Sequence, residues 1–238
     1  MHESCLDSLR VFIDAYLAPY TDEKLAILDV GSAVVEPTQP SDRTAITCVQ
    51  WKYIGLDIMP GHNVDVVVAD PYRWSEIADA SVDVVICNQV LEHAEWFWLT
   101  VQEIARVLKP RGLAMLIAPS AGLVHRFPTD CWRFYPDGLP AVARYAGLTV
   151  LENHRQMLPL YRKSNRWRDA ALIAQKPDGA GASVITLVQP KGALAARAQA
   201  LLAGQSALAL KWRAAKPHIR ALSRIIRYPA ARLDDIDA

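Results

Sequence analysis

Polar side chains stand at or directly after several short apolar runs of this sequence. They are Asp29 in the first run, which Gly31 follows, and Asp57, Asp70 and Asn88 at the ends of the next three runs. A carboxylate can accept both hydroxyls of a ribose, a second can accept an adenine amine, and a glycine turn lets the backbone approach a ligand closely. The order of these residues predicts a nucleoside site. The alternative is that each acid only caps a helix or a turn.

Two histidines with acidic neighbours are the candidates for moving a proton. His93 follows Glu92 after the fourth run, and His125 lies five residues before Asp130 after the fifth run. The pKa of an imidazole lies near neutrality, so either ring can take a proton from a hydroxyl group, with Asp130 orienting it. The alternative for His93 is that it only caps the turn after its strand.

The stretch HRFPTDCWRFYPDG is the most distinctive in the chain. Its aromatic rings can stack on sugar rings while its Asp, Arg and His side chains bond hydroxyl groups, so its composition suits a saccharide acceptor. The alternative is a rigid corner with Trp132 and Phe134 packed inward, which we favour for these two residues. In that corner, Arg133 pairs with Asp130 or Asp137.

Strands and helices alternate among the elements that must position these residues. Short apolar runs bounded by Gly, Pro, Asp or Asn predict strands covered on both faces at 26–30, 52–58, 64–69, 82–87 and 113–118. Helical spacing predicts helices at 5–17, 96–108 and 136–147, with no convincing helix between Gly31 and Trp51.

The chain after residue 147 adds two strands, at 148–157 and 169–176, which can form an antiparallel hairpin at the sheet edge. The whole pattern predicts an α/β, Rossmann-like fold with a doubly wound, mostly parallel seven-stranded sheet. In such sheets the ligand lies over the carboxyl ends of the strands.

The formal net charge of +1 is the sum of two unlike parts. Residues 1–190 carry 17 bases and 22 acids, a net charge of −5, and residues 191–238 carry nine bases and three acids, a net charge of +6. We expect a folded domain at 1–190 and a basic, Ala-rich helical tail at 191–238, with no dedicated nucleic-acid binding. The tail suits an anionic membrane surface, its own acidic body or a second subunit of a homodimer.

Hydrophobic residues make up 52% of the chain, which excludes wholesale disorder. The four cysteines lie far apart and form no pair with zinc-ligand spacing, which predicts a reducing compartment. We find neither a signal-peptide pattern nor an uninterrupted apolar span. These features predict a cytoplasmic protein, which the tail can bring to the inner face of the membrane.

Five stretches, in this order, resemble the S-adenosylmethionine-dependent class I methyltransferases: ILDVGS, YIGLDIMPG, VVVADPY, SVDVVICNQVLEH and EIARVLKPRGLAMLIAPS. The resemblance runs from about Lys24 to Lys176. It implies S-adenosyl-L-methionine as cofactor, with contacts from Asp29, Gly31, Ser32, Asp57, Ile58, Asp70, Pro71, Tyr72, Asn88 and Gln89. There are two departures: the loop after Gly31 lacks the two further glycines of the family, and Arg111 stands where glycine is common.

A second resemblance concerns a metal. The run QVLEH is similar to the metal-binding run of the ubiquinone-pathway O-methyltransferases and the small-RNA 3′-end methyltransferases, with Gln89 in place of a first glutamate. It implies Mg²⁺ or another divalent cation on Glu92, His93 and His125. Many relatives carry a similar LEH run without metal, and we favour a metal-free site.

The HRFPTDCWRFYPDG stretch resembles a loop that closes over the acceptor in small bacterial methyltransferases of glycan and cell-surface clusters. This implies transfer of a methyl group to a hydroxyl of a saccharide or glycan precursor. One alternative is methylation of a nitrogen, carbon or phenolic oxygen of another small metabolite. Another is a non-catalytic binding module that acts through its basic tail, an alternative motivated by the unusual glycine loop.

Overall fold

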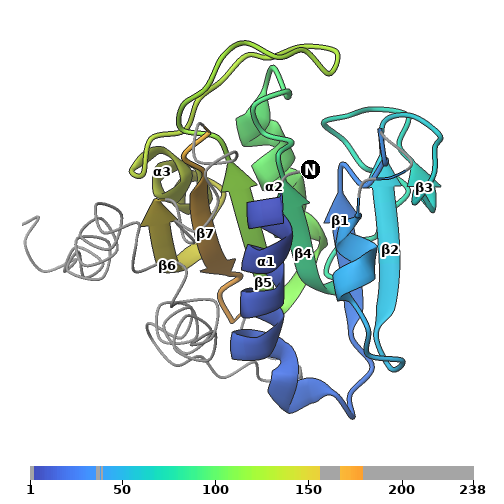
Figure 1. Cartoon of the computed structure of the whole chain (residues 1–238). Helices are drawn as coiled ribbons and strands as arrows, with labels where there is room; N and C mark the ends of the chain where they lie inside the picture. Colours follow the sequence, from blue (N-terminus) through green and yellow to red (C-terminus); the bar gives the residue numbers. More distant parts are fainter. Residues whose placement is uncertain (1–2, 36–37, 39, 156–166, 179–238) are drawn as a thin grey trace, which may run out of the picture.

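The computed structural model describes residues 3–35, 38, 40–155 and 167–178. A seven-stranded sheet runs through its centre in the order β3-β2-β1-β4-β5-β7-β6 (Figure 1). The strands are β1 Ala26–Val30, β2 Lys52–Asp57, β3 Val66–Val67, β4 Val82–Asn88, β5 Leu108–Ala118, β6 Thr149–Arg155 and β7 Ala170–Gln175. Strands β1 to β5 pair in parallel, whereas β7 is antiparallel to both of its neighbours. The predicted Rossmann-like sheet, with an antiparallel hairpin at its edge, is confirmed.

Helices cover both faces of this sheet, which is why its central strands are mostly apolar. Helix α1 (Glu3–Phe12) lies on one face, and α2 (Phe97–Val107) and α3 (Gly138–Tyr145) lie on the other (Figure 1). Every residue of β4 is buried. Its Ile86 belongs to the same core cluster as Leu9 of α1, and its Val85 belongs to the cluster of Ile104 of α2.

Two crossovers on the β1–β3 side contain almost no helix. Among the described residues of the connection from β1 to β2, one short turn, Asp42–Ala45, is the only helical element, as the lack of a helical pattern there predicted. The predicted strand at 64–69 is wrong in its length, because only Val66 and Val67 pair with β2. The chain turns at Asn63, whose φ is 76°, and again at Asp70, whose carbonyl accepts the Arg73 N–H at 3.2 Å.

Strand β5 begins at Leu108, five residues earlier than the sequence predicted. The Lys-Pro-Arg-Gly segment between the predicted helix and the predicted strand belongs to this strand. Its Arg111 has a φ of 64°, in the left-handed region, at the position where the resembled family commonly has glycine. The Arg111 N–H donates to the Lys176 carbonyl at 2.9 Å, and its carbonyl accepts from the Gln175 amide at 2.9 Å. Contacts with the end of β7 and the next residue therefore hold this backbone conformation.

The predicted basic tail at 191–238 lies outside the described residues. Within the described part of the chain, no helix has the length and apolar character needed to cross a membrane.

Candidate cofactor and acceptor site

The turn after β1 requires glycine. The N–H groups of Gly31 and Ser32 both donate to the Leu56 carbonyl, at 2.8 and 3.1 Å, so the turn is tied to the end of β2. Gly31 has a φ of 75°, and a Cβ atom there would overlap Cγ2 of Val90, which follows β4. The backbone can therefore pass close to the ends of both neighbouring strands only because this residue has no side chain.

Asp57 at the end of β2 is held in place by backbone amides. Its Oδ1 accepts the N–H groups of Ile58 and Met59, at 2.8 and 3.2 Å, and its Oδ2 accepts that of Ala33 at 3.0 Å. A carboxylate has about four acceptor positions, so Asp57 keeps capacity for one more donor. That capacity suits a ribose hydroxyl, and the predicted role in holding both hydroxyls stays a prediction.

Three of the predicted cofactor-binding residues, Asp70, Pro71 and Tyr72, lie in the segment between β3 and β4. Asp70 Oδ1 accepts the Tyr72 N–H at 2.8 Å, so this carboxylate also shapes its own turn. The Tyr72 ring lies against that of Trp96, with centroids 5.0 Å apart. Pro71 accepts the indole N–H of Trp74 on its carbonyl at 3.0 Å, which anchors the segment in the core.

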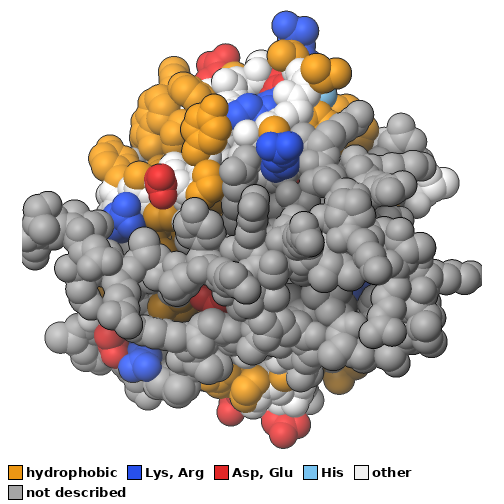
Figure 2. All heavy atoms as spheres, turned by 60° about the vertical axis from the view of Figure 1, so that its left-hand side comes forward, with side chains coloured by type: hydrophobic (Ala, Val, Ile, Leu, Met, Phe, Trp, Pro, Cys, Tyr) orange, Lys and Arg blue, Asp and Glu red, His pale blue; other side chains and the backbone are white. Residues whose placement is uncertain are grey.

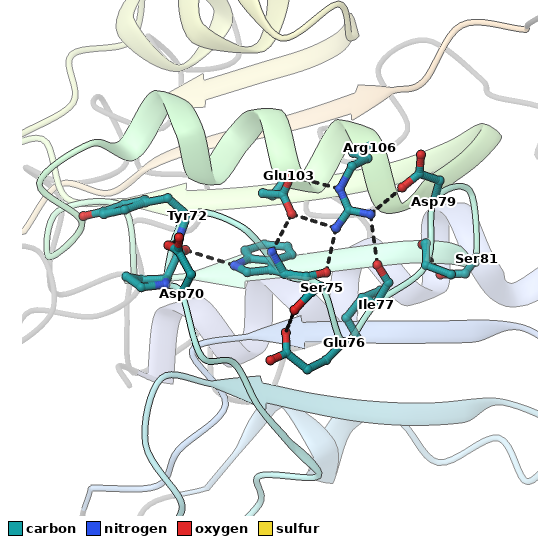
Figure 3. A network of polar contacts seen from close by, with 12 residues as sticks. Asp70, Tyr72, Ser75, Glu76, Ile77, Asp79, Ser81, Glu103 and Arg106 are labelled. Carbon is teal, nitrogen blue, oxygen red and sulfur yellow. Dashed lines mark hydrogen bonds and ion pairs between the residues drawn. The ribbon is translucent and has the colours of Figure 1, made fainter.

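A polar clamp from α2 holds this same segment, in place of a helix of its own (Figure 3). The Arg106 guanidinium donates to the carbonyls of Trp74 and Ile77, at 2.8 and 2.9 Å. It also bonds both oxygens of Glu103, at 2.9 and 2.7 Å, and Glu103 accepts the Trp74 N–H at 2.7 Å. The sequence analysis missed this pair, although Glu103 and Arg106 have the (i, i+3) spacing of neighbours on one helix face.

Asn88, which ends β4, donates its amide Nδ2 to Oδ2 of Asp42 at 2.9 Å. Asp29 lies close to the same site and accepts the hydroxyl of Tyr53. Burial and the Asp42 charge raise the pKa of Asp29 well above its usual range, and burial raises the pKa of Asp42 to about 6. Sequence analysis missed Asp42, because nothing in the loop indicated which of its polar residues returns to the sheet.

The Gln89 side chain is bonded to the residue that precedes β7. Its φ of 58° is left-handed, and its Nε2 donates to Oδ1 of Asp169 at 3.1 Å. Asp169 stands just before β7 and also accepts from Ser4 at 3.4 Å and from Cys5 at 3.7 Å, both in α1. These contacts give Gln89 a positioning role at the strand end, while its predicted contact with the cofactor stays a prediction.

The His93 ring has a defined tautomer. Its Nδ1 lies 2.5 Å from the Thr129 carbonyl, which can only accept, so Nδ1 carries the proton and Nε2 has a free lone pair. The Thr129 hydroxyl donates back to the His93 carbonyl at 2.7 Å. Burial lowers the pKa of His93, so the ring is neutral at pH 7 and Nε2 can accept a proton.

His125 and Asp130 form a second unit near the first. The two histidine rings lie edge to face with centroids 4.9 Å apart. Asp130 Oδ2 accepts the His125 N–H at 2.6 Å and lies 3.2 Å from its Nδ1. Arg133 binds both Asp130 oxygens, at 2.5 and 2.7 Å, and holds the pKa of this carboxyl well below its usual range. Asp130 is therefore a permanent anion that holds the His125 backbone N–H, while His125 Nδ1 makes no hydrogen bond among the described residues. The predicted role of Asp130 in orienting the ring stays a prediction.

Glu92 is fully buried beside both histidines. Its Oε1 lies 3.7 Å from His93 Nε2, and neither carboxylate oxygen has a hydrogen-bond partner among the described residues. Burial raises its pKa to about 8. One ligand atom from each of Glu92, His93 and His125 falls within 4.8 Å of the others, which is close enough for one cation. The three residues predicted as metal ligands are thus brought together.

The aromatic residues of the 125–138 stretch divide between core and surface. Phe134 is buried, as predicted, with its ring 4.9 Å from that of Phe97. Trp132 is 38% exposed, so the prediction that it packs inward is only half right: its indole N–H is tied to the Ala94 and Glu95 carbonyls, at 3.0 and 3.1 Å.

A hollow of about 490 Å³ opens beside these rings, lined by Phe97, Trp132, Arg133, Phe134, Tyr135, Asp137 and Gly138. Hydrophobic side chains gather with a few basic ones at the top of the molecule in Figure 2. The large exposed apolar residues of the segment after β5 are Leu123, Val124, Phe127, Trp132 and Tyr135. This segment rises above the carboxyl ends of the strands in Figure 1, so aromatic surface and candidate bases share one edge of the sheet.

Comparison with known proteins finds one family match and a common fold. Residues 28–116 match a family described as a methyltransferase domain. No curated protein matches the sequence significantly. The fold is similar to that of a Burkholderia thailandensis 1,6-didemethyltoxoflavin-N1-methyltransferase solved with 1,6-didemethyltoxoflavin and S-adenosylhomocysteine, at 13% identity and a TM-score of 0.57 over 74% of this chain and 79% of that one.

The fold is also similar to that of the cyclase SpnF, at 17% identity and a TM-score of 0.54 over 73% of this chain and 82% of that one. A cyclase and a methyltransferase thus share this architecture, and the fold alone does not determine the reaction. The described chain has the Rossmann-like fold found in methyltransferases, and its residues 28–116 match the methyltransferase-domain family.

Proposed function

We propose that the protein transfers the methyl group of S-adenosyl-L-methionine to a hydroxyl of a saccharide or glycan precursor. The observation that carries the proposal is the neutral His93. It follows the carboxyl end of β4, and its Nε2 has a free lone pair. A methyl group on a sulfonium is already activated, so the protein needs only to align the acceptor and remove its proton.

The cofactor fits the residues at the ends of β1, β2 and β4. The Gly31 turn leaves no side chain in the path of a ligand, and Asp57 has one acceptor position left after binding three amides. Asn88 Oδ1 is buried and has no partner among the described residues, so it can accept a hydrogen bond from a ligand. When bound, the cofactor supplies the electrophilic methyl carbon.

In the proposed reaction, the acceptor oxygen forms its bond to the methyl carbon as the bond from that carbon to sulfur breaks, and the acceptor proton moves to His93 Nε2. The electron pair of the broken bond stays on sulfur, so S-adenosylhomocysteine is the leaving group. The Thr129 carbonyl keeps the opposite ring nitrogen protonated and stabilises the imidazolium that results. His125, whose ring lies next to that of His93 and close to the Asp130 carboxylate, is the alternative base.

A divalent cation is a second candidate for activating the hydroxyl. It would be held by Glu92, His93 Nε2 and His125, whose ligand atoms lie within 4.8 Å of one another. Two orphaned oxygens on a fully buried Glu92 are the observation that favours this arrangement. Mg²⁺ prefers oxygen ligands, so a site with two imidazoles suits a divalent transition metal better. The Gln89 Nε2 is bound to Asp169, and its Oε1 has no partner among the described residues.

The saccharide class rests on the aromatic hollow. The half-exposed Trp132 and the exposed Tyr135 offer ring faces, and Arg133 and Asp137 offer polar groups at the same wall. Sugars are recognised by this combination of stacking and hydroxyl hydrogen bonds.

Mass spectrometry of saccharide acceptors incubated with enzyme and isotopically labelled methyl donor tests the proposal. We expect label on a hydroxyl oxygen, and a loss of about 10²- to 10⁴-fold in kcat for His93→Ala with cofactor binding retained. His154→Gln, on the edge strand β6, is the matched control and should keep full activity. Label on nitrogen, carbon or a phenolic oxygen, with activity indifferent to both histidines, would support the other acceptor class.

Two further results separate the remaining alternatives. Activity that survives exhaustive chelation rules out the cation, whereas restoration by Mn²⁺ or Mg²⁺ supports it. Calorimetry that detects no binding of S-adenosyl-L-methionine supports the non-catalytic module.

A further inference from the structure

We propose that Asp42 binds the α-ammonium group of the cofactor's methionine portion. The inference rests on the proposed function and adds to it a binding residue outside the sequence stretches that resemble the family. Asp42 opens the short turn between β1 and β2 and reaches the ends of β1 and β4, where Asp29 and Asn88 stand.

Two buried acceptor atoms at this place lack donors. Asp42 is 3% exposed; its Oδ2 accepts from Asn88, but its Oδ1 has no partner among the described residues. Asn88 is 8% exposed, and its Oδ1 is also without a described partner. A buried acceptor without a donor is unfavourable. Two such acceptors, on side chains that are hydrogen-bonded to each other, indicate a ligand that brings N–H groups.

The two acids also lack an ion-pair partner among the described residues. Asp29 is buried close enough to Asp42 for the Asp42 charge to raise its pKa, and no Lys or Arg in the described ranges forms an ion pair with either acid. The charge of Arg43 lowers the Asp29 pKa, but its guanidinium bonds Asp65 at 2.5 Å and Asn63 at 2.6 Å instead. Two neighbouring buried carboxyl groups without a direct ion pair are stabilised by a positively charged ligand.

An ammonium group satisfies both conditions, because it carries positive charge and three donors. The methionine portion of the cofactor brings one such group to the ends of β1 and β4. The loop after Gly31 has none of the further glycines of the resembled family, and it supplies a carboxylate to this edge instead. Asp42 is therefore the residue through which this unusual loop recognises the cofactor.

Calorimetry with three ligands tests the assignment: S-adenosyl-L-methionine, S-adenosylhomocysteine, and 5′-methylthioadenosine, which lacks the amino-acid portion. We expect Asp42→Asn to lower the affinity for S-adenosyl-L-methionine and S-adenosylhomocysteine by about 10- to 100-fold. The affinity for 5′-methylthioadenosine should fall by less than about twofold. Asp22→Asn, an exposed acid with no described role, is the matched control and should change none of them.

Wild-type protein provides a measurement that does not depend on how the variant folds. An S-adenosylhomocysteine analogue without its α-amino group should bind about 10-fold or more weaker than S-adenosylhomocysteine itself. Equal affinities for that pair, or unchanged S-adenosyl-L-methionine binding by a folded Asp42→Asn, overturn the assignment and leave the proposed function intact. A wild-type protein that binds none of the ligands overturns both.

Discussion

Replacing Arg106 by alanine removes the clamp that holds the segment between β3 and β4. The guanidinium donates to the carbonyls of Trp74 and Ile77, and this segment has no helix of its own. Arg106 is 29% exposed, so water can partly replace it, and we assign roughly 1 kcal/mol to each carbonyl bond. The ion pair with Asp79 adds little, because Asp79 is 79% exposed.

The expected loss is about 2 kcal/mol of unfolding free energy, or roughly 4–8 °C in Tm for a domain of this size. Urea denaturation measures the first quantity, and hydrogen exchange of peptides covering residues 70–80 locates the loss. Exchange should accelerate there and stay unchanged in β4. Because Tyr72 lies in the same segment, affinity for S-adenosyl-L-methionine should fall by about three- to tenfold, in line with one lost positioning contact.

Arg144→Ala is the matched control, since this arginine also stands in the last turn of a helix but is exposed. Its effect should stay within about 0.5 kcal/mol. The reasoning is refuted if Arg106→Ala changes stability no more than Arg144→Ala does, or if exchange accelerates evenly over the whole sheet.

Four other perturbations have defined outcomes. Gly31→Ala should lower the free energy of unfolding by more than the roughly 1–2 kcal/mol that a left-handed alanine costs, because its Cβ would also overlap Val90. Val90→Ala should remove the part due to this overlap in a double-mutant cycle measured by urea denaturation. Since burial raises the pKa of Asp42 to about 6, the folded state binds its proton more tightly than the unfolded one, and wild type should lose stability relative to Asp42→Asn as pH rises from 3.8 to about 6. Phe134→Ala should cost roughly 3–5 kcal/mol in the same denaturation assay, because the ring is buried. Removal of residues 191–238 should reduce co-sedimentation with anionic liposomes, and unchanged sedimentation contradicts a membrane role for the tail.

The sheet was predictable because its determinants are local. The run AILDV is followed directly by a glycine, and β1 spans these same five residues in the structure. The short β3 was not predictable in its length, since its end depends on the Asp70 turn and on having one neighbour only. Apolar composition indicates that a segment can be a strand, but pairing decides how much of it is one.

The candidate site was predictable where a residue stands at a strand end. Asp29, Asp57 and Asn88 follow directly from the strand pattern, and their side chains lie where the parallel ends meet. Asp42 and Arg106 depend on which distant segment their side chains reach, which no periodicity encodes. Glu92 was named for its neighbours in sequence, whereas its complete burial comes from the segment after β5, whose Cys131 N–H donates to the Glu92 carbonyl at 2.7 Å.

The position of β7 has a consequence for the order in which the chain assembles. β5 and β6 run in the same direction, and β7 enters between them although it follows both in sequence. During synthesis the outer edge of β5 is therefore open until residues 170–175 emerge, and β6 lacks its partner in this sheet before then. An open edge of an apolar strand is a template for wrong pairing. The synthesis of β7 thus decides when this sheet is protected from aggregation, and a chain released before residue 170 should be recovered mainly as aggregate.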